Sequence, residues 1–71
     1  MRTETLIRLG RNIGSVRRTK RMSQEQLAHE SGLHRTYVGG VERGERNLGV
    51  VNLVRLARAL DVAPSDLLKG I

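Results

Sequence analysis

The sequence predicts an all-α fold in which five short helices make one small domain over residues 1–71. Three observations support this fold class. Apolar residues recur at steps of three and four in successive segments, which is the period of an amphipathic helix. No segment shows the strict alternation of apolar and polar residues that is typical of a strand. With 71 residues, the chain has room for a single core, because two cores would each be too small to offset the entropy of ordering the chain.

The first helix is predicted over about 4–18. Gly10 and Gly14 lie four residues apart on it, and we interpret them as sites of close packing against a neighbour within a soluble fold. Arginines surround both glycines, so this spacing does not indicate a membrane dimer motif. The apolar positions that follow the helical period are Leu6, Leu9, Ile13 and Val16.

The segment over about 23–43 has the pattern of a helix-turn-helix. Ser23 can cap the first turn of a helix while Gln26 reaches back, which is a capping box. That helix ends at Gly32, since glycine readily takes the left-handed conformation found at helix ends. After two further residues a second helix is predicted. Two short helices joined by a tight turn with Gly are typical of helix-turn-helix proteins, whose second helix enters the major groove of DNA.

Two more helices are predicted toward the C-terminus. Apolar residues at the helical period indicate one over about 50–60, and Pro64 at a first helical position indicates a short one over about 64–69. We expect this end to form a two-fold dimer interface, because it holds more apolar residues than a short tail can bury alone. The alternative is that these residues complete the core of the single chain. They are Leu60, Val62, Leu67, Leu68 and Ile71.

The charge of the chain indicates a polyanionic partner. Thirteen Lys and Arg oppose seven Asp and Glu, for a formal net charge of +6, and eleven of the thirteen are Arg, whose planar guanidinium suits phosphate and guanine edges. The alternative is that this charge only keeps a basic surface solvated. The chain has no Cys, which fits a reducing compartment, and it has no apolar run long enough for a membrane span or signal peptide. We therefore expect a cytoplasmic protein.

Several side chains in the helix-turn-helix segment are candidates for DNA contacts. Arg35 and Thr36 stand in the first turn of its second helix, the part of a recognition helix that reaches base edges. The Arg35 guanidinium can bond O6 and N7 of guanine together, while Thr36 offers a hydroxyl and a methyl. Tyr37 is expected to bond a phosphate, or else to be partly buried as the only aromatic residue. Gln24 opens the first helix, where free amides and the helix dipole favour a phosphate.

These residues stand in a segment, SQEQLAHESGLHRTYVGGVERGERN, that resembles the helix-turn-helix of the lambda-repressor-like, or Xre, family. Within that family, LHRTYVGGVERGERN in so short a chain resembles the controller proteins of restriction–modification systems. The resemblance extends from LGRNI through LARALDVAPSDLL, which is nearly the whole chain. It implies a five-helix, dimeric, sequence-specific DNA-binding repressor or activator.

The resemblance also implies roles for single residues. The family clamps a backbone phosphate with the glutamine that matches Gln24. Arg46 and Asn47 match positions that touch the DNA backbone or a base, although an ordinary turn is the alternative for both. Arg17 and Glu42 match positions that often form an ion pair, which would leave Arg17 near a phosphate. In all, base contacts are expected from Arg35, Thr36, Gly39 and Arg46, and phosphate contacts from Ser23, Gln24, Tyr37, Arg17, Arg43 and Asn47.

Gly39 and Gly40 interrupt the middle of the predicted recognition helix, where each lowers helix stability by roughly 1 kcal/mol relative to Ala. A close approach must offset this loss. We expect the preceding helix to approach at Gly40 and DNA to approach at Gly39. Controller proteins commonly have a small polar residue where Gly39 stands, so the resemblance implies that one possible hydrogen bond to DNA is missing here.

Together these observations predict a dimeric transcriptional regulator that binds a palindromic operator and controls restriction–modification genes and its own gene. A phage-type repressor or an antitoxin-type autoregulator is the alternative within the same class. An RNA-binding or protein-adaptor module is the alternative from a different class. The single aromatic residue argues against single-stranded RNA, which is usually held by stacking.

No enzyme activity, cofactor, metal ion or small-molecule ligand is expected. The chain lacks the sequence patterns of a nucleophile elbow, a zinc protease helix and a phosphate loop. His29 and His34 fall on different elements with no third ligand in sight, so we do not expect a metal site. Both histidines are expected to face solvent.

Overall fold

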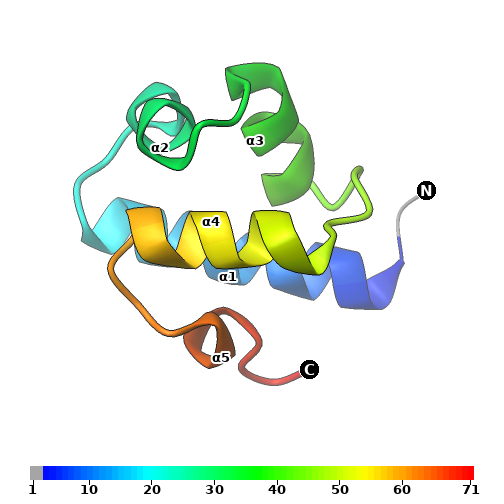
Figure 1. The fold of residues 1–71 in the computed structure, drawn as a ribbon. Helices are drawn as coiled ribbons and strands as arrows, with labels where there is room; N and C mark the ends of the chain where they lie inside the picture. The colour runs from blue at the N-terminus through cyan, green and yellow to red at the C-terminus, as the bar shows by residue number, and fades with distance from the viewer. Residues whose placement is uncertain (1–2) are drawn as a thin grey trace.

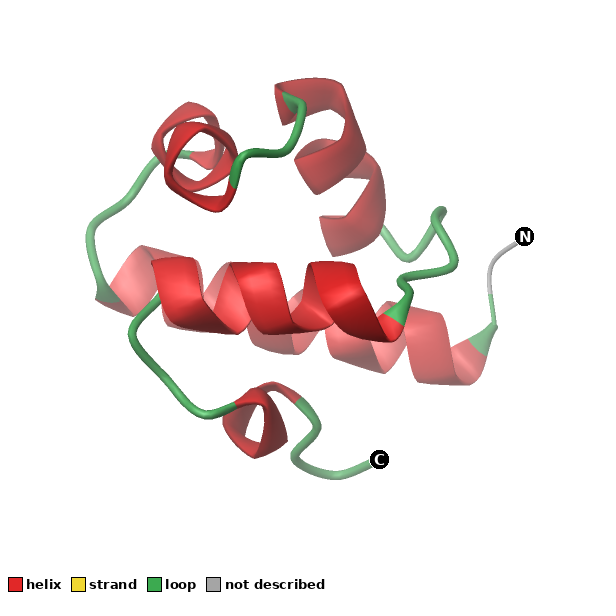
Figure 2. Cartoon of the chain, in the orientation of Figure 1, coloured by secondary structure: helices red, strands yellow, loops and turns green. Residues whose placement is uncertain are grey.

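The computed structural model describes residues 3–71, so residues 1–2 of the predicted domain lie outside the described part. Within residues 3–71 the chain forms five helices and no strand, which confirms the predicted all-α fold (Figure 1). The loops between the helices are short (Figure 2). None of the described helices is long and apolar enough to span a membrane. The helices are α1 Glu4–Thr19, α2 Gln24–Ser31, α3 Arg35–Glu42, α4 Val50–Ala59 and α5 Pro64–Leu67.

Local signals in the sequence account for the helix boundaries. The Thr3 hydroxyl accepts a hydrogen bond from the first turn of α1. Ser23 and Gln26 form the predicted capping box at the start of α2, and Gly32 ends that helix with a left-handed φ of 72°. Pro64 opens α5, which ends at Leu67, two residues before the predicted end. Within the segment over about 23–43, the two helices span Gln24–Ser31 and Arg35–Glu42.

The five helices pack around one aliphatic core. Figure 1 shows α2 and α3 on one side of the α1 and α4 helices and α5 on the other side, in agreement with contacts of α5 to α1 and α4. Helix α1 packs closely on α3, since a Cβ on Gly10 would lie 2.6 Å from the carbonyl oxygen of Glu42. This confirms the interpretation of Gly10. The buried apolar residues are Leu9, Ile13, Leu27, Ala28, Val38, Val41, Leu56, Ala57, Leu60 and Leu67.

The structure corrects the predicted set of dimer residues. Leu60 and Leu67 are 1% and 0% exposed in the single chain, so the prediction that they face a partner is wrong. Both complete the monomer core, because α5 folds back onto α1 and α4. Val62 is half-buried against the same core. Leu68 and Ile71 remain 40% and 55% exposed, and their place in an interface stays a prediction.

The candidate nucleic-acid interface

The side chains predicted to contact DNA meet where the start of α2 approaches α3. Helix α3 buries Val38 and Val41 in the core and leaves Arg35 and Thr36 exposed. A shallow open hollow here has five lining residues, drawn from both helices of the motif. We call this hollow the recognition surface. It is lined by Gln24, Arg35, Thr36, Gly39 and Arg43.

A nearly buried ion pair lies beneath the recognition surface. Arg17 donates from Nε to Oε2 of Glu42 at 2.7 Å and from Nη2 to Oε1 at 3.0 Å. The side chains of Arg17 and Glu42 are only 12% and 8% exposed. The pKa of Arg17 is raised, chiefly by its hydrogen bond to Glu42. Burial lowers this pKa and the negative charge of Glu42 raises it further. The predicted pair is therefore present, and it fixes α1 against α3.

Arg17 also holds the segment that precedes α2. Its third nitrogen, Nη1, donates to the carbonyl oxygen of Met22 at 2.9 Å, so each of the three nitrogens makes a hydrogen bond inside the protein. A guanidinium has five N–H donors, so these three bonds leave two of them, and the predicted contact of Arg17 with a phosphate stays a prediction.

Gln24 is held by the same carboxylate. Its Nε2 donates to Oε1 of Glu42 at 3.1 Å, which places the amide beside Gly39: a Cβ on Gly39 would lie 3.5 Å from Gln24 Oε1 and 3.1 Å from Arg43 Nη1. The amide oxygen and the second amide hydrogen of Gln24 keep their hydrogen-bonding capacity. The prediction that DNA approaches Gly39 stays open.

Gly40 makes a different close contact from the one predicted. A Cβ on Gly40 would lie 2.9 Å from Cγ of Arg46, so the arginine of the following loop, and not the preceding helix, takes this space. The expectation of a helix approach at Gly40 was wrong, because the side chain of Arg46 folds back over α3. The absence of a side chain at Gly40 thus lets Arg46 of the α3–α4 loop pack against α3.

Tyr37 joins α3 to α4. The ring is half-buried against the core, and its hydroxyl accepts a hydrogen bond from Asn52 Nδ2 at 3.1 Å. The guanidinium carbon of Arg46 lies 5.9 Å from the ring centre, within the range of a cation–π interaction. Sequence reasoning missed Asn52, whose only signal is a polar side chain among the apolar residues that open α4. The Tyr37 hydroxyl hydrogen remains available to an acceptor.

The remaining predicted contact residues are Arg43 of the recognition surface, Ser23 at the start of α2, and two residues of the loop after α3. Arg43 Nε donates to Glu45 Oε1 at 3.0 Å, in a pair that is largely exposed and therefore weak. Arg46 and Asn47 are exposed in the loop after α3. The Ser23 hydroxyl accepts from the backbone of Gln26 at 3.0 Å. Its own hydrogen can still be donated.

The two histidines are exposed and lie on different elements, as predicted. Within residues 3–71 no group of three His, Cys, Asp or Glu side chains is placed to hold a metal ion.

Comparison with known proteins agrees with this arrangement. Residues 13–67 match the helix-turn-helix family. The control protein C.SmaI of Serratia marcescens is 52% identical over 60 residues, which cover 84% of this chain and 71% of the relative. The control protein C.BamHI of Bacillus amyloliquefaciens is 47% identical over 60 residues, which cover 83% of this chain and 74% of the relative.

A solved structure shows the same fold. The restriction–modification controller protein C.AhdI from Aeromonas hydrophila superimposes with a TM-score of 0.86 at 52% identity, over 87% of this chain and 94% of the other. The chain belongs to the controller proteins. Controller proteins are helix-turn-helix regulators of transcription, so the resemblance noted in the sequence is confirmed, together with the DNA-binding regulatory function that it implied.

Proposed function

We propose that this controller protein acts as a homodimer that binds a palindromic operator through two copies of the recognition surface. One observation carries the proposal: Arg35 and Thr36 from α3 and Gln24 from α2 line a single open hollow. The chain has a formal net charge of +6, which favours approach to a polyanion. A recognition helix needs this combination of exposed leading side chains and an adjacent phosphate anchor.

The residues divide into readers and clamps. Arg35 offers two parallel donors to guanine, and Thr36, Gly39 and Arg46 would make further base contacts. The clamps hold backbone phosphates, which position the protein without carrying sequence information. They are Ser23, Gln24, Tyr37, Arg17, Arg43 and Asn47.

The dimer would form through the apolar residues that the monomer leaves exposed. Val50 and Val51 are 76% and 67% exposed at the start of α4, and Leu68 and Ile71 are exposed at the C-terminal end. An apolar surface of this kind is stabilised when a second copy covers it. A two-fold arrangement would place the recognition helices about 34–36 Å apart, one turn of DNA.

The regulated genes would be those of a restriction–modification system, as the names of the relatives suggest, together with the gene for the chain itself. Concentration would act as the input, through dimerisation and cooperative occupancy of the operator. A DNA partner and the absence of Cys both fit a cytoplasmic location.

Selection of bound duplexes from a random pool tests the proposal. We expect a two-fold symmetric consensus whose half-sites are separated by about one helical turn. A titration with single-stranded RNA that carries the selected consensus sequence serves as the control. Equal affinity for RNA and for duplexes of any sequence would contradict the proposal.

A further inference from the structure

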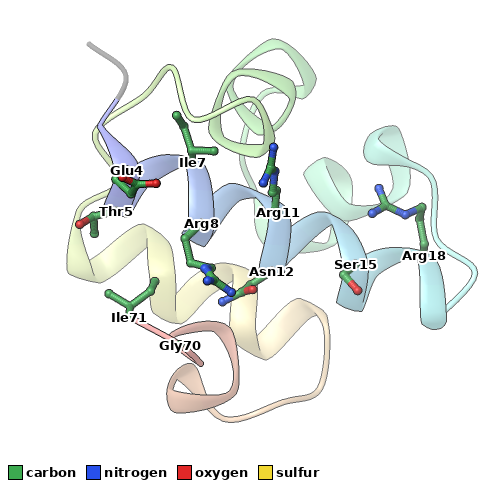
Figure 3. Close-up of a pocket in the computed structure, with 10 residues that line it drawn as sticks. All are labelled: Glu4, Thr5, Ile7, Arg8, Arg11, Asn12, Ser15, Arg18, Gly70 and Ile71. Carbon is green, nitrogen blue, oxygen red and sulfur yellow. The ribbon is translucent and has the colours of Figure 1, made fainter.

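The outer face of α1 carries three arginines that the recognition surface does not include. Arg8, Arg11 and Arg18 are all exposed. They line a broad open hollow between α1 and the C-terminal residues (Figure 3). In the described residues, Arg17 and Arg43 are the arginines that form ion pairs, so these three positive charges are not neutralised by a carboxylate of residues 3–71.

The three side chains do not point the same way. Figure 3 shows Arg8 turned toward Asn12 and Gly70, whereas Arg11 and Arg18 extend toward the side on which α2 and α3 lie. Arg8 is packed there, since a Cβ on Gly70 would lie 3.2 Å from its Nη1. Asn12 holds the same turn by donating from Nδ2 to the carbonyl oxygen of Leu67 at 2.9 Å.

Arg18 lies near the carboxylate that holds Gln24. A Cβ on Gly14 would lie 3.2 Å from Nη1 of Arg18 and 3.0 Å from Oε1 of Glu42. The same Glu42 oxygen accepts from Gln24, and Gln24 lies beside Gly39. Because Gly14 has no side chain, the guanidinium of Arg18 can lie over α1 on the side of Glu42.

We infer that Arg11 and Arg18 bind backbone phosphates of the duplex just outside the operator half-site, as a sequence-independent anchor on α1. This inference rests on the proposed function. The two residues are seven apart, which is about 10.5 Å along a helix. Successive phosphates of one strand advance about 3.4 Å along the duplex axis, so the pair matches about three phosphate steps.

Duplex DNA is the occupant that the observations favour over an acidic protein. Figure 3 shows both guanidinium groups directed toward the side on which α2 and α3 lie, and these two helices carry the recognition surface, so DNA docked there would lie on the same side of α1. Guanidinium forks also suit phosphate oxygens. Contacts of this kind widen the footprint without adding sequence preference.

The test compares two duplexes that carry the same selected operator. One duplex ends flush with the half-sites, and the other has about one helical turn, or about 10 base pairs, of flanking DNA on each side. Affinity is measured against salt for the wild type and for the double variant Arg11→Gln, Arg18→Gln. On the long duplex the variant should lose about 3.6 from the slope of log affinity against log salt, at about 0.9 for each of the four phosphate contacts, two from each subunit. On the flush duplex the two proteins should have the same slope.

The chain supplies matched controls. Arg8→Gln removes the same charge from the same helix, and Arg55→Gln removes an exposed arginine of α4; both should keep the wild-type slope on both duplexes. Overlapping thermal melts would show that all variants fold alike. Equal slopes for the double variant and the wild type on the long duplex, or an equal loss on both duplexes, would overturn the inference. Failure of the wild type to prefer its operator would instead contradict the proposed function.

Discussion

The recognition surface and the apolar C-terminal end differ in what lies behind their exposed side chains. Behind Arg35 and Thr36 stands a polar network, in which Glu42 holds Arg17 and Gln24 at distances of 2.7–3.1 Å. Beside Leu68, the side chain of Leu67 is buried in the aliphatic core, and Asn12 donates to the carbonyl oxygens of Leu67 and Lys69 at 2.9 Å. The side chains of the recognition surface are thus positioned by directional bonds, whereas those of the apolar end are positioned by packing on a backbone that Asn12 holds.

This difference determines how the two regions respond to change. Hydrogen bonds fix the angle of a side chain, so loss of one partner leaves a specific group unpaired. Packing has no such direction, so the loss of a methyl group lowers stability according to the volume of the cavity that it leaves.

The largest effect is expected at the C-terminal end. Leu67→Ala should lower the free energy of unfolding by about 2–5 kcal/mol, because it opens a cavity in a small core. Leu68→Ala, one residue along and 40% exposed, is the control and should change it by less than about 1 kcal/mol. Urea denaturation measures both. Similar losses for the two variants would show that α5 does not pack as described.

A somewhat smaller effect is expected beneath the recognition surface. Glu42→Gln should lower the free energy of unfolding by about 2–3 kcal/mol, because it leaves the positive charge of Arg17 unpaired at a site only 12% exposed. The exposed pair offers the control: Glu45→Gln should change stability by about 0.5 kcal/mol or less. If urea melts give equal shifts, Glu42 does not hold the surface in place.

The smallest change in stability is expected at the start of α4, although assembly should change. Val51→Lys alters a side chain that is 67% exposed, so the stability of the monomer fold should move by about 0.5 kcal/mol or less. A buried lysine would oppose dimer formation, and sedimentation should show a lower mass than for the wild type at the same concentration. The exposed Arg58→Lys keeps the charge of α4 and serves as the control. An unchanged mass for Val51→Lys would place the interface elsewhere.

The sequence predicted the helices and most of the recognition surface. Capping at Ser23, the left-handed Gly32 and Pro64 are local signals, which act over a few residues and can be read without the fold. Arg35 and Thr36 were predicted as base contacts from their place in the first turn of the second helix of the motif, and the structure leaves both exposed.

The apolar end was predicted less well for a physical reason. Periodicity shows that Leu60 and Leu67 are hidden from water but not which surface hides them, since the core of the chain and a second subunit exclude water equally. Val50 stands at the helical period of α4, which predicts burial, yet the fold leaves it exposed together with its neighbour Val51. The contacts of Arg46 with Tyr37 and Gly40 depend on the path of the α3–α4 loop, and the helix propensities of single residues do not determine that path.

The central claim is that the first turn of α3 reads bases while the start of α2 clamps phosphate. The most direct measurement is the affinity of Arg35→Ala and Gln24→Ala for the selected operator, for operators substituted at single positions, and for random duplex. Arg35→Ala should reduce discrimination by about 1–3 kcal/mol at one position of each half-site, and Gln24→Ala should weaken binding to all duplexes alike. Equal losses for both variants on operator and random DNA would contradict the account.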